Sequence, residues 1–362
     1  LIGNINAGGG GVNRNLIING AMNVSQRHGT SSVQLSATEQ YLTDRFFNDS
    51  GSSFDMKADA VQSTDAPSGF SNSLKLSCDG VSSLSSSSNG GISQLIEGQN
   101  CQTLAFGTSD AKPITLSFYA KSSSQNSGHT YGIMFGAFLN GTRNIQTRGF
   151  TVTSSWQRFT MTFQPNSLVT STGINHNNGK GIQVFFSLAG GGDDLQNYSV
   201  WTNDQSLSGF TGQNNFFDNT SNEFFLTGVQ LEVGQNPTTF EHEPVERTLA
   251  KCQRYTYRIN SNTSDDTMIG AGYHQATTTF RAIVHFPVTM RSGPTVTTND
   301  ADLTLLRDTT SDDSVTLGSS LDESEFSCGL NISGVTSTTV GEGGILRLST
   351  TGTGFMQFDS EL

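Results

Sequence analysis

The sequence predicts an all-β protein with two β-sandwich domains, a jelly roll followed by a smaller sandwich, joined by one short helix. Short segments rich in Phe, Val, Ile and Thr recur along the chain, separated by turns containing Gly, Asn and Ser. Only 33% of the residues are hydrophobic, but 24 of them are Phe, whose large side chains bury enough apolar area for ordered cores. The 362 residues suit two such domains and an N-terminal leader.

Four segments are expected along the chain. Residues 1–14, which include Gly8–Gly11, are predicted to be a flexible N-terminal leader or stalk attachment. A jelly roll follows in 15–244, a linker helix in 245–258 and a C-terminal sandwich in 259–362.

From Leu74 to about Gly234 the predicted jelly roll has about eight strands, the number typical of that fold, and two further strand candidates precede this span. Asn140-Gly141 marks a tight hairpin turn. Trp156 begins an alternating strand and is predicted to lie in the core. The expected strands are Leu16–Ile18, Tyr41–Phe47, Leu74–Cys78, Gly91–Ile96, Ile114–Lys121, Tyr131–Phe138, Trp156–Phe163, Gly181–Leu188 and Phe224–Val233.

The linker helix is predicted from its end residues and from its spacing. Pro244 suits the first turn, and Val245, Leu249 and Cys252 form an apolar stripe that should be buried. The second sandwich is expected to contain Thr277–Pro287, where His285 should be partly buried. Its other strands are Thr295–Thr298, Ile345–Ser349 and Phe355–Phe358.

The charge pattern argues against nucleic acid as a partner. The formal net charge is -12, with 31 acidic and 19 basic residues, and no cluster of Lys and Arg is present to bind phosphates. Acidic residues gather in the second sandwich, where they are interpreted as part of solvated, mutually repelling loops. The alternative is divalent-cation binding or repulsion of wrong partners. These acids are Asp300, Asp302, Asp308, Asp312, Asp313, Asp322, Glu323 and Glu325.

The cysteine spacing argues against a zinc site, and the hydropathy of the sequence argues against a membrane-spanning segment. Cys78, Cys101, Cys252 and Cys328 lack the spacing of a zinc site and are expected to be small buried hydrophobes. No apolar run is long enough to span a membrane, and no signal peptide is recognised. Because the chain opens at Leu1 rather than Met, it is expected to be a fragment or to have an earlier start.

Two resemblances cover nearly the whole chain. The span from about 70 to 234 resembles a carbohydrate-binding-module jelly roll, through Ile92–Ile96, Leu116–Ser122 and Thr151–Trp156. The rest resembles bacteriophage tail-fibre, or receptor-binding, proteins with a C-terminal fibre-tip β-domain. That resemblance is carried by Asn15–Arg27, Leu226–Tyr257, Phe286–Arg291, Pro294–Val296 and Phe358–Leu362.

The tail-fibre resemblance implies a virion protein in the phage tail, usually a homotrimer, that contacts other phage tail proteins. It also implies that the distal domains present themselves to polysaccharide on the host-cell surface. Membrane insertion is not expected.

One loop contains the candidate glycan-binding residues. Tyr198 and Trp201 are interleaved with amides and with Asn203 and Asp204, a mixture that suits sugar stacking and hydroxyl recognition. The favoured alternative is that Trp201 anchors a long loop onto its own sheet.

Acidic motifs elsewhere are weaker candidates. Asp193 and Asp194 follow three glycines and are interpreted as a turn, with calcium as a possible cofactor. Catalysis is disfavoured, because a glycosidase needs two carboxyl groups at a fixed separation and a glycine-flanked pair is not held rigidly. Glu241-His242-Glu243 is predicted to make surface or intersubunit salt bridges. No nucleophile elbow, phosphate-binding loop or zinc-protease motif is present.

The sequence therefore predicts a non-enzymatic phage protein that attaches to host-surface glycans. The alternatives are a purely structural virion component, such as a nozzle, adaptor or head fibre, a depolymerase, and a bacterial surface adhesin from an integrated prophage.

Overall fold

The chain divides into two compact units, each with its own hydrophobic core. The computed structural model describes residues 13–51, 54–169, 172–204, 209–307, 312–335 and 339–362. The first unit comprises residues up to Thr248, and the second comprises Leu249–Glu361. Each unit is described by itself below.

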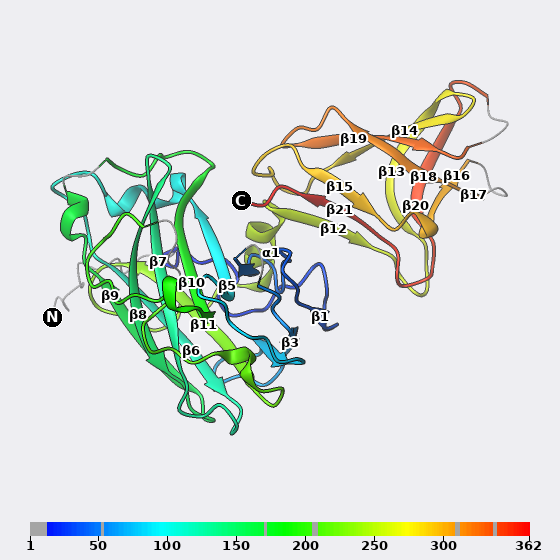
Figure 1. The fold of residues 1–362 in the computed structure, drawn as a ribbon. Coiled ribbons are helices and arrows are strands. Elements are labelled where there is room, and N and C mark those ends of the chain that lie inside the picture. The colour runs from blue at the N-terminus through cyan, green and yellow to red at the C-terminus, as the bar shows by residue number, and fades with distance from the viewer. Residues whose placement is uncertain (1–12, 52–53, 170–171, 205–208, 308–311, 336–338) are drawn as a thin grey trace, which may run out of the picture. The chain divides into compact units, whose positions relative to one another are not determined.

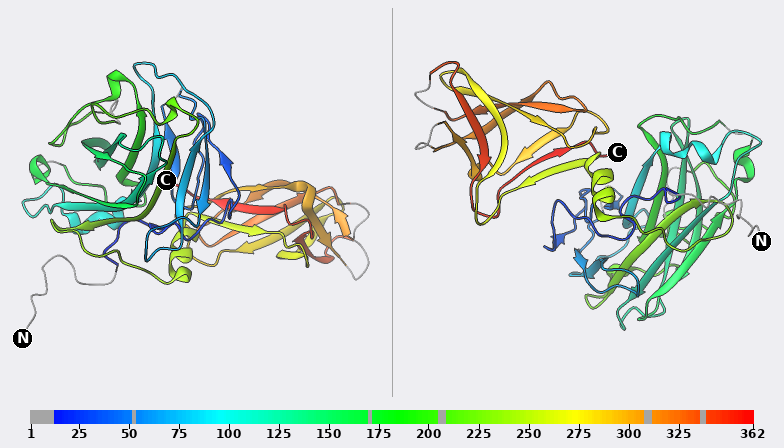
Figure 2. Two further views of the ribbon diagram at one scale, coloured as in Figure 1. Left: turned by 90° about the horizontal axis from the view of Figure 1, so that it is seen from below. Right: turned by 180° about the vertical axis from the view of Figure 1, so that it is seen from behind.

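The first unit is a sandwich of two antiparallel sheets (Figures 1 and 2). The six-stranded sheet has the order β1-β3-β4-β11-β6-β9, and the five-stranded sheet has the order β2-β5-β10-β7-β8. The strands are β1 Val33–Gln34, β2 Phe47–Ser50, β3 Ala58–Ser63, β4 Ser73–Cys78, β5 Asn89–Glu97, β6 Ile114–Ser122, β7 Thr130–Leu139, β8 Thr142–Thr151, β9 Gln157–Phe163, β10 Lys180–Gly190 and β11 Glu223–Val233. The chain passes repeatedly between the sheets, as in a jelly roll.

Alternating side chains build the core between these sheets. Phe118 of β6 packs with its ring edge-on to Phe150 of β8 and Phe186 of β10, and its ring is stacked on Phe159 of β9. All but Phe159 are buried. Short 3-10 turns connect strands of this unit at η1 Gly98–Leu104, η2 Asn166–Val169, η3 Gly192–Asp194 and η4 Phe216–Asp218.

The N-terminal part of the first unit is less regular than predicted. Residues 42–46 form a turn and not a strand, and β2 begins only at Phe47. The reason is that Arg45 has a left-handed φ of 73° and Leu42 donates its N–H to the Phe46 carbonyl. Leu16–Ile18 is not a regular strand either. The predicted Asn140-Gly141 turn between β7 and β8 is confirmed, with left-handed φ values of 47° and 81°.

The second unit is a smaller sandwich of a three-stranded sheet, β12-β21-β15, and a seven-stranded sheet, β17-β16-β20-β13-β14-β19-β18 (Figure 1). Phe280, Val284 and Phe358 are buried in its core. Its elements are β12 Thr256–Asn260, β13 Thr267–Ala276, β14 Thr279–His285, β15 Thr295–Thr298, η5 Asp300–Asp302, β16 Leu303–Leu306, β17 Asp312–Ser314, β18 Thr316–Leu321, β19 Ser327–Ser333, β20 Gly343–Leu348 and β21 Phe355–Asp359.

The predicted fold class, all-β with two sandwiches, is confirmed. In the described residues the only α-helix is α1, Val245–Gln253. Two predicted burials are wrong. Val245 of α1 is 53% exposed, although the predicted apolar stripe placed it against other residues. His285 was predicted to be partly buried, but it is exposed because it lies on the outer side of β14. Among the described residues, no helix has the length and apolar character needed to cross a membrane.

Candidate functional site

The loop that follows β10 carries the candidate glycan-binding residues along the free edge of β8. Ile145 of β8 exchanges two backbone hydrogen bonds with Thr202, and Thr147 donates its N–H to the Tyr198 carbonyl at 3.0 Å. The Thr147 hydroxyl also accepts the Tyr198 N–H at 2.8 Å. The loop therefore extends the five-stranded sheet beyond β8, and its side chains reach both faces of that sheet.

Trp201 lies on the inner side, in the core, and this corrects its assignment as a sugar-stacking residue. Its side chain is 6% exposed, and its ring packs edge-on against Phe106 at 5.9 Å and Phe135 at 5.6 Å between centroids. Its Nε1–H donates to the Gln164 carbonyl at 2.7 Å. With its ring surrounded, Trp201 has no open face for a sugar, and it matches the alternative role of anchoring the loop.

Tyr198 lies on the outer face of the same sheet. It packs on an apolar cluster made by Met134 of β7, Ile145 of β8 and Phe185 of β10. Its hydroxyl lies 3.5 Å from the Asp204 carboxylate. The structure thus brings Tyr198 and Asp204 together, while Asn203 between them is exposed.

Beside this apolar cluster, a row of polar side chains crosses the sheet from β2 to β8. Gln183 of β10 donates from its amide nitrogen to Asp49 of β2 at 2.8 Å and to the Ser93 hydroxyl of β5 at 2.9 Å. Its amide oxygen accepts from Arg143 of β8 at 3.2 Å. We call Asp49, Ser93, Gln183 and Arg143 the polar row.

The sheet register explains how residues distant in the sequence form the polar row. Gln183 is paired with Gly136 of β7, and a Cβ at Gly136 would lie 3.3 Å from the Arg143 stem. The absence of a side chain there lets Arg143 cross β7 toward Gln183. Any larger residue would force this stem aside.

The electrostatics of the polar row reflect its burial. Burial raises the pKa of the Asp49 carboxyl, although hydrogen bonds from Ser93 and Gln183 and the charges of Arg143 and Lys180 act in the opposite direction. Burial likewise lowers the pKa of Arg143, although the negative charges of Asp49 and Asp204 act to raise it. The Asp49 carboxylate and the Arg143 guanidinium each hydrogen-bond the Gln183 side-chain amide, in a partly water-excluded place where hydrogen bonds are strong.

These side chains present acceptors and donors side by side, next to an aromatic ring. Asp49 is an acceptor when ionised, Arg143 is a donor, and Gln183 is both. Donors and acceptors placed side by side can bind neighbouring hydroxyl groups of a ligand and fix their orientation, while the Tyr198 ring offers apolar contact. Sequence reasoning missed Asp49, Gln183 and Arg143. The available signal was a polar Gln inside an otherwise apolar strand.

Asp193 and Asp194 lie in the 3-10 turn η3 at the end of β10. Asp194 is buried, which raises its pKa, and it accepts a long hydrogen bond of 3.4 Å from Asn89. Asp193 is exposed. Across the ranges that the structure describes, no group of three or more His, Cys, Asp or Glu side chains is arranged to hold a metal ion. Calcium binding here stays a prediction.

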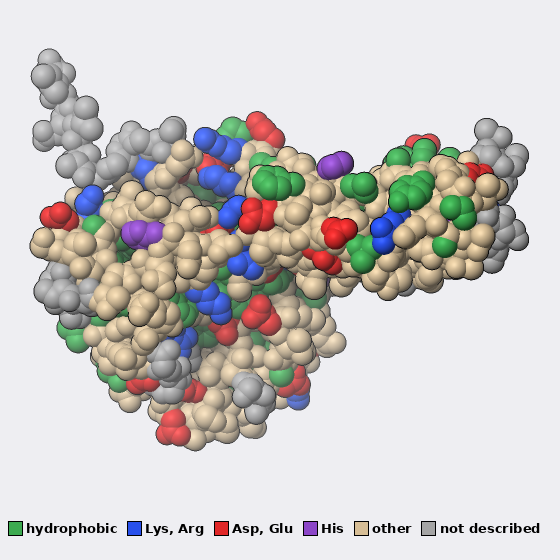
Figure 3. All heavy atoms as spheres, turned by 90° about the horizontal axis from the view of Figure 1, so that it is seen from above, with side chains coloured by type: hydrophobic (Ala, Val, Ile, Leu, Met, Phe, Trp, Pro, Cys, Tyr) green, Lys and Arg blue, Asp and Glu red, His purple; other side chains and the backbone are tan. Residues whose placement is uncertain are grey.

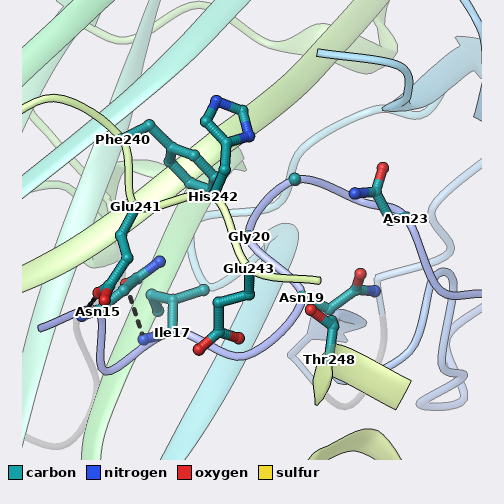
Figure 4. A pocket seen from close by; sticks show the side chains of 11 residues that line it. Asn15, Ile17, Asn19, Gly20, Asn23, Phe240, Glu241, His242, Glu243 and Thr248 are labelled. Carbon is teal, nitrogen blue, oxygen red and sulfur yellow. Dashed lines mark hydrogen bonds between the residues drawn. The ribbon is translucent and has the colours of Figure 1, made fainter. Parts of the chain in front are cut away.

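Glu241 binds the beginning of the described chain. Its carboxylate accepts backbone N–H groups from Asn13 at 2.6 Å, Arg14 at 2.7 Å and Asn15 at 3.0 Å. Figure 4 shows Glu241 directed toward Asn15, in a small pocket that also contains the rings of Phe240 and His242. These contacts within one chain involve Glu241, and the salt bridges predicted for Glu241-His242-Glu243 stay a prediction.

The Glu241 contacts lead to a first testable prediction. Burial alone would raise the pKa of Glu241, but the N–H groups of residues 13–15 outweigh it and lower the pKa. The stabilisation is therefore complete above the unfolded-state pKa and is lost as the pH falls through the lowered folded-state value. Replacing Glu241 by Gln is expected to reduce hydrogen-exchange protection of amides 13–15 by about threefold to tenfold at pH 7.

Mass spectrometry of amide exchange checks this prediction, with Glu246→Gln as the matched control because Glu246 is exposed. Equal protection in both variants would show that the carboxylate charge does not hold this segment.

The comparisons with known proteins found solved structures whose fold is similar to that of this chain, and nothing beyond that similarity. No family model matches the chain, and no curated protein matches it. Among solved structures, the family 11 carbohydrate-binding module of a Clostridium thermocellum cellulase is 15% identical, with a TM-score of 0.29, over 60% of this chain and 99% of that chain. The xylan-binding module CBM22-1 from Paenibacillus barcinonensis is 9% identical, with a TM-score of 0.26, over 58% and 99%.

A third similar structure is the enzymatically active domain of tailspike protein 4 from bacteriophage CBA120. It is 11% identical, with a TM-score of 0.31, over 61% of this chain and 21% of that chain. These identities and scores are low, so the description of the first unit as a jelly-roll sandwich rests on its own sheets.

Proposed function

We propose that this protein binds glycans without enzymatic activity, through the outer face of the five-stranded sheet. The observation that carries the proposal is the polar row beside the Tyr198 cluster. Donors and acceptors from four strands converge there next to an aromatic side chain, as hydroxyl-rich ligands require. Binding would be reversible, with Asp49 accepting ligand hydroxyls and Arg143 donating to ligand oxygens. Gln183 is 6% exposed and would position these two side chains through its own hydrogen bonds.

We further propose that the glycan is a host-surface polysaccharide and that the protein is a homotrimeric tail-fibre component of a phage virion. The tail-fibre resemblance of the sequence supports this role. Exposed apolar side chains on the second unit support self-association, because another copy would remove them from water. Hydrophobic side chains are visible on the surface of that unit in Figure 3, and the large exposed ones include Met268, Tyr273, Ile283 and Phe326.

Replacing Gln183 by Ala tests the site. The change removes the donor to Asp49 and Ser93 and the acceptor for Arg143, so affinity for a bound polysaccharide is expected to fall at least about tenfold, or about 1.4 kcal/mol. Affinity electrophoresis against neutral and acidic bacterial polysaccharides, with adhesion to host cells, provides the measurement. Gln102→Ala, which changes an exposed amide in the same unit, is the matched control.

The outcomes separate the competing functions. Binding that is lost in Gln183→Ala and kept in Gln102→Ala supports the proposal. Binding unchanged in both variants would move the glycan site away from this face. A folded wild-type protein that binds neither polysaccharide nor cells would favour the purely structural virion role. Release of reducing sugar from the polysaccharides would favour a depolymerase.

A further inference from the structure

A second group of aromatic and charged side chains lies on the outer face of the six-stranded sheet. Lys75 of β4, Phe225 of β11 and Lys121 of β6 are direct cross-strand neighbours. Trp156 immediately precedes β9, the edge strand next to β6, and Asp65 belongs to the loop after β3. These five residues come from five places in the sequence and meet on the side of the sandwich opposite to the polar row.

The arrangement of the five residues is specific. The ammonium groups of Lys121 and Lys75 lie 4.5 Å and 5.3 Å from the centroid of the buried Phe225 ring. Trp156 packs edge-on to this ring at 6.2 Å between centroids. Such cation–ring contacts fix the lysine stems against the sheet.

Asp65 connects Trp156 to Lys121. One carboxylate oxygen accepts the Trp156 Nε1–H at 3.1 Å, and the other contacts the Lys121 ammonium at 2.5 Å. Burial alone would raise the pKa of Asp65, but the hydrogen bonds from Lys121 and Trp156 outweigh it and lower the pKa. The indole is thereby held in one orientation although Trp156 is only half-buried.

The charges of this surface cancel. Lys121 is paired with Asp65, and Lys75 is paired with Glu223 at 2.6 Å. Two cations therefore face two carboxylates, so that the surface offers both donors and acceptors without a net charge. A strongly anionic ligand gains little from such a surface, whereas an uncharged hydroxyl-rich ligand matches it.

We propose that Trp156, with Asp65 and Lys121, is a second carbohydrate-contact surface that takes the face of an uncharged pyranose ring. The indole would stack on the sugar, and the paired carboxylate and ammonium would bond its hydroxyls. That the ligand is a carbohydrate rests on the proposed function. The location of this second surface is argued from its own residues and does not depend on the polar row. Two surfaces on opposite faces of one sandwich can each hold a different polysaccharide strand, so that attachment strengthens through avidity.

The two tryptophans of this chain make the proposal directly measurable. Trp156 is half-buried, and Trp201 is 6% exposed. Acrylamide quenching of tryptophan fluorescence therefore reports mainly on Trp156. With a neutral polysaccharide that the wild-type protein binds, quenching is expected to fall by about half when ligand is added. The Trp156→Phe variant is expected to show no ligand-dependent change, because only Trp201 remains.

Affinity measurements complete the test. Trp156→Ala is expected to weaken binding of the same polysaccharide about threefold to tenfold, and Asp65→Asn is expected to weaken it less, because the asparagine amide oxygen still accepts the indole N–H. Near-ultraviolet circular dichroism checks that each variant is folded. An unchanged affinity in Trp156→Ala together with unchanged wild-type quenching overturns the second surface.

The two proposals fail differently. If Gln183→Ala loses binding while the Trp156 variants bind normally and show no quenching effect, the second surface is wrong and the proposed function stands. If quenching protection persists in Gln183→Ala with reduced affinity, the two surfaces act independently, as proposed. If the wild-type protein binds no neutral or acidic polysaccharide, both proposals are overturned.

Discussion

Replacing Trp201 by Ala is expected to lower the free energy of unfolding of the first unit by about 3–5 kcal/mol. The side chain fills core space between Phe106 and Phe135, and the smaller residue would leave a cavity there. The Gln164 carbonyl would also lose the indole N–H that it accepts at 2.7 Å. A surface-exposed stacking residue would show no such loss.

Urea denaturation followed by far-ultraviolet circular dichroism measures this change. Trp156→Ala is the matched control and is expected to cost only about 1 kcal/mol, because the ring is half-buried and makes one side-chain hydrogen bond. If both substitutions reduced stability equally, the assignment of Trp201 to the core would be wrong.

Replacing Asp49 by Asn is expected to weaken polysaccharide binding at least about tenfold at a pH where the Asp49 carboxyl is ionised, without reducing stability. Burial raises the folded-state pKa of Asp49 above its unfolded value. Its contribution to stability is therefore most favourable when the carboxyl is protonated, and it decreases as the pH rises through the folded-state pKa. At a pH above this raised pKa the wild-type protein carries a partly buried charge, which asparagine removes, and the ligand then loses a charged acceptor.

The pH dependence gives this prediction a distinct signature. Wild-type affinity should fall as the pH decreases through the raised pKa of Asp49, and the affinity of Asp49→Asn should stay level over the same range. Isothermal titration at several pH values, with urea denaturation of each variant, makes the comparison. Asp55→Asn is the control, because Asp55 is an exposed acid in the same unit. Parallel pH profiles in the wild type and Asp49→Asn would exclude Asp49 as the acceptor.

The division of Tyr198 and Trp201 between two faces could have been predicted. In an extended segment, residues separated by three positions point to opposite sides. The loop is extended because it pairs with β8, so one aromatic side chain enters the core and the other covers the outer face. Because the prediction considered only which residue types occur in the loop, it assigned Tyr198 and Trp201 to one aromatic surface.

Other parts of the site could not be obtained from the sequence. Strand existence follows from local alternation, which is why the class and most strands of the first unit were predicted correctly. Asp49, Gln183 and Arg143 come from three strands, and their meeting depends on strand order and register. For Trp156 the strand was recognised, but the prediction that its side chain lies in the core is wrong. It is half-buried at the outer face, where its indole N–H donates to Asp65.

The attachment of residues 13–16 to the first unit has a mechanical consequence. Asn15 accepts the Leu231 N–H through its side chain and donates to the Val229 carbonyl, and Leu16 donates its N–H to the Leu231 carbonyl. β11 lies between β4 and β6, inside the six-stranded sheet. Tension applied at Asn13 would thus reach a central strand through several hydrogen bonds strained together, rather than unzip an edge strand one bond at a time.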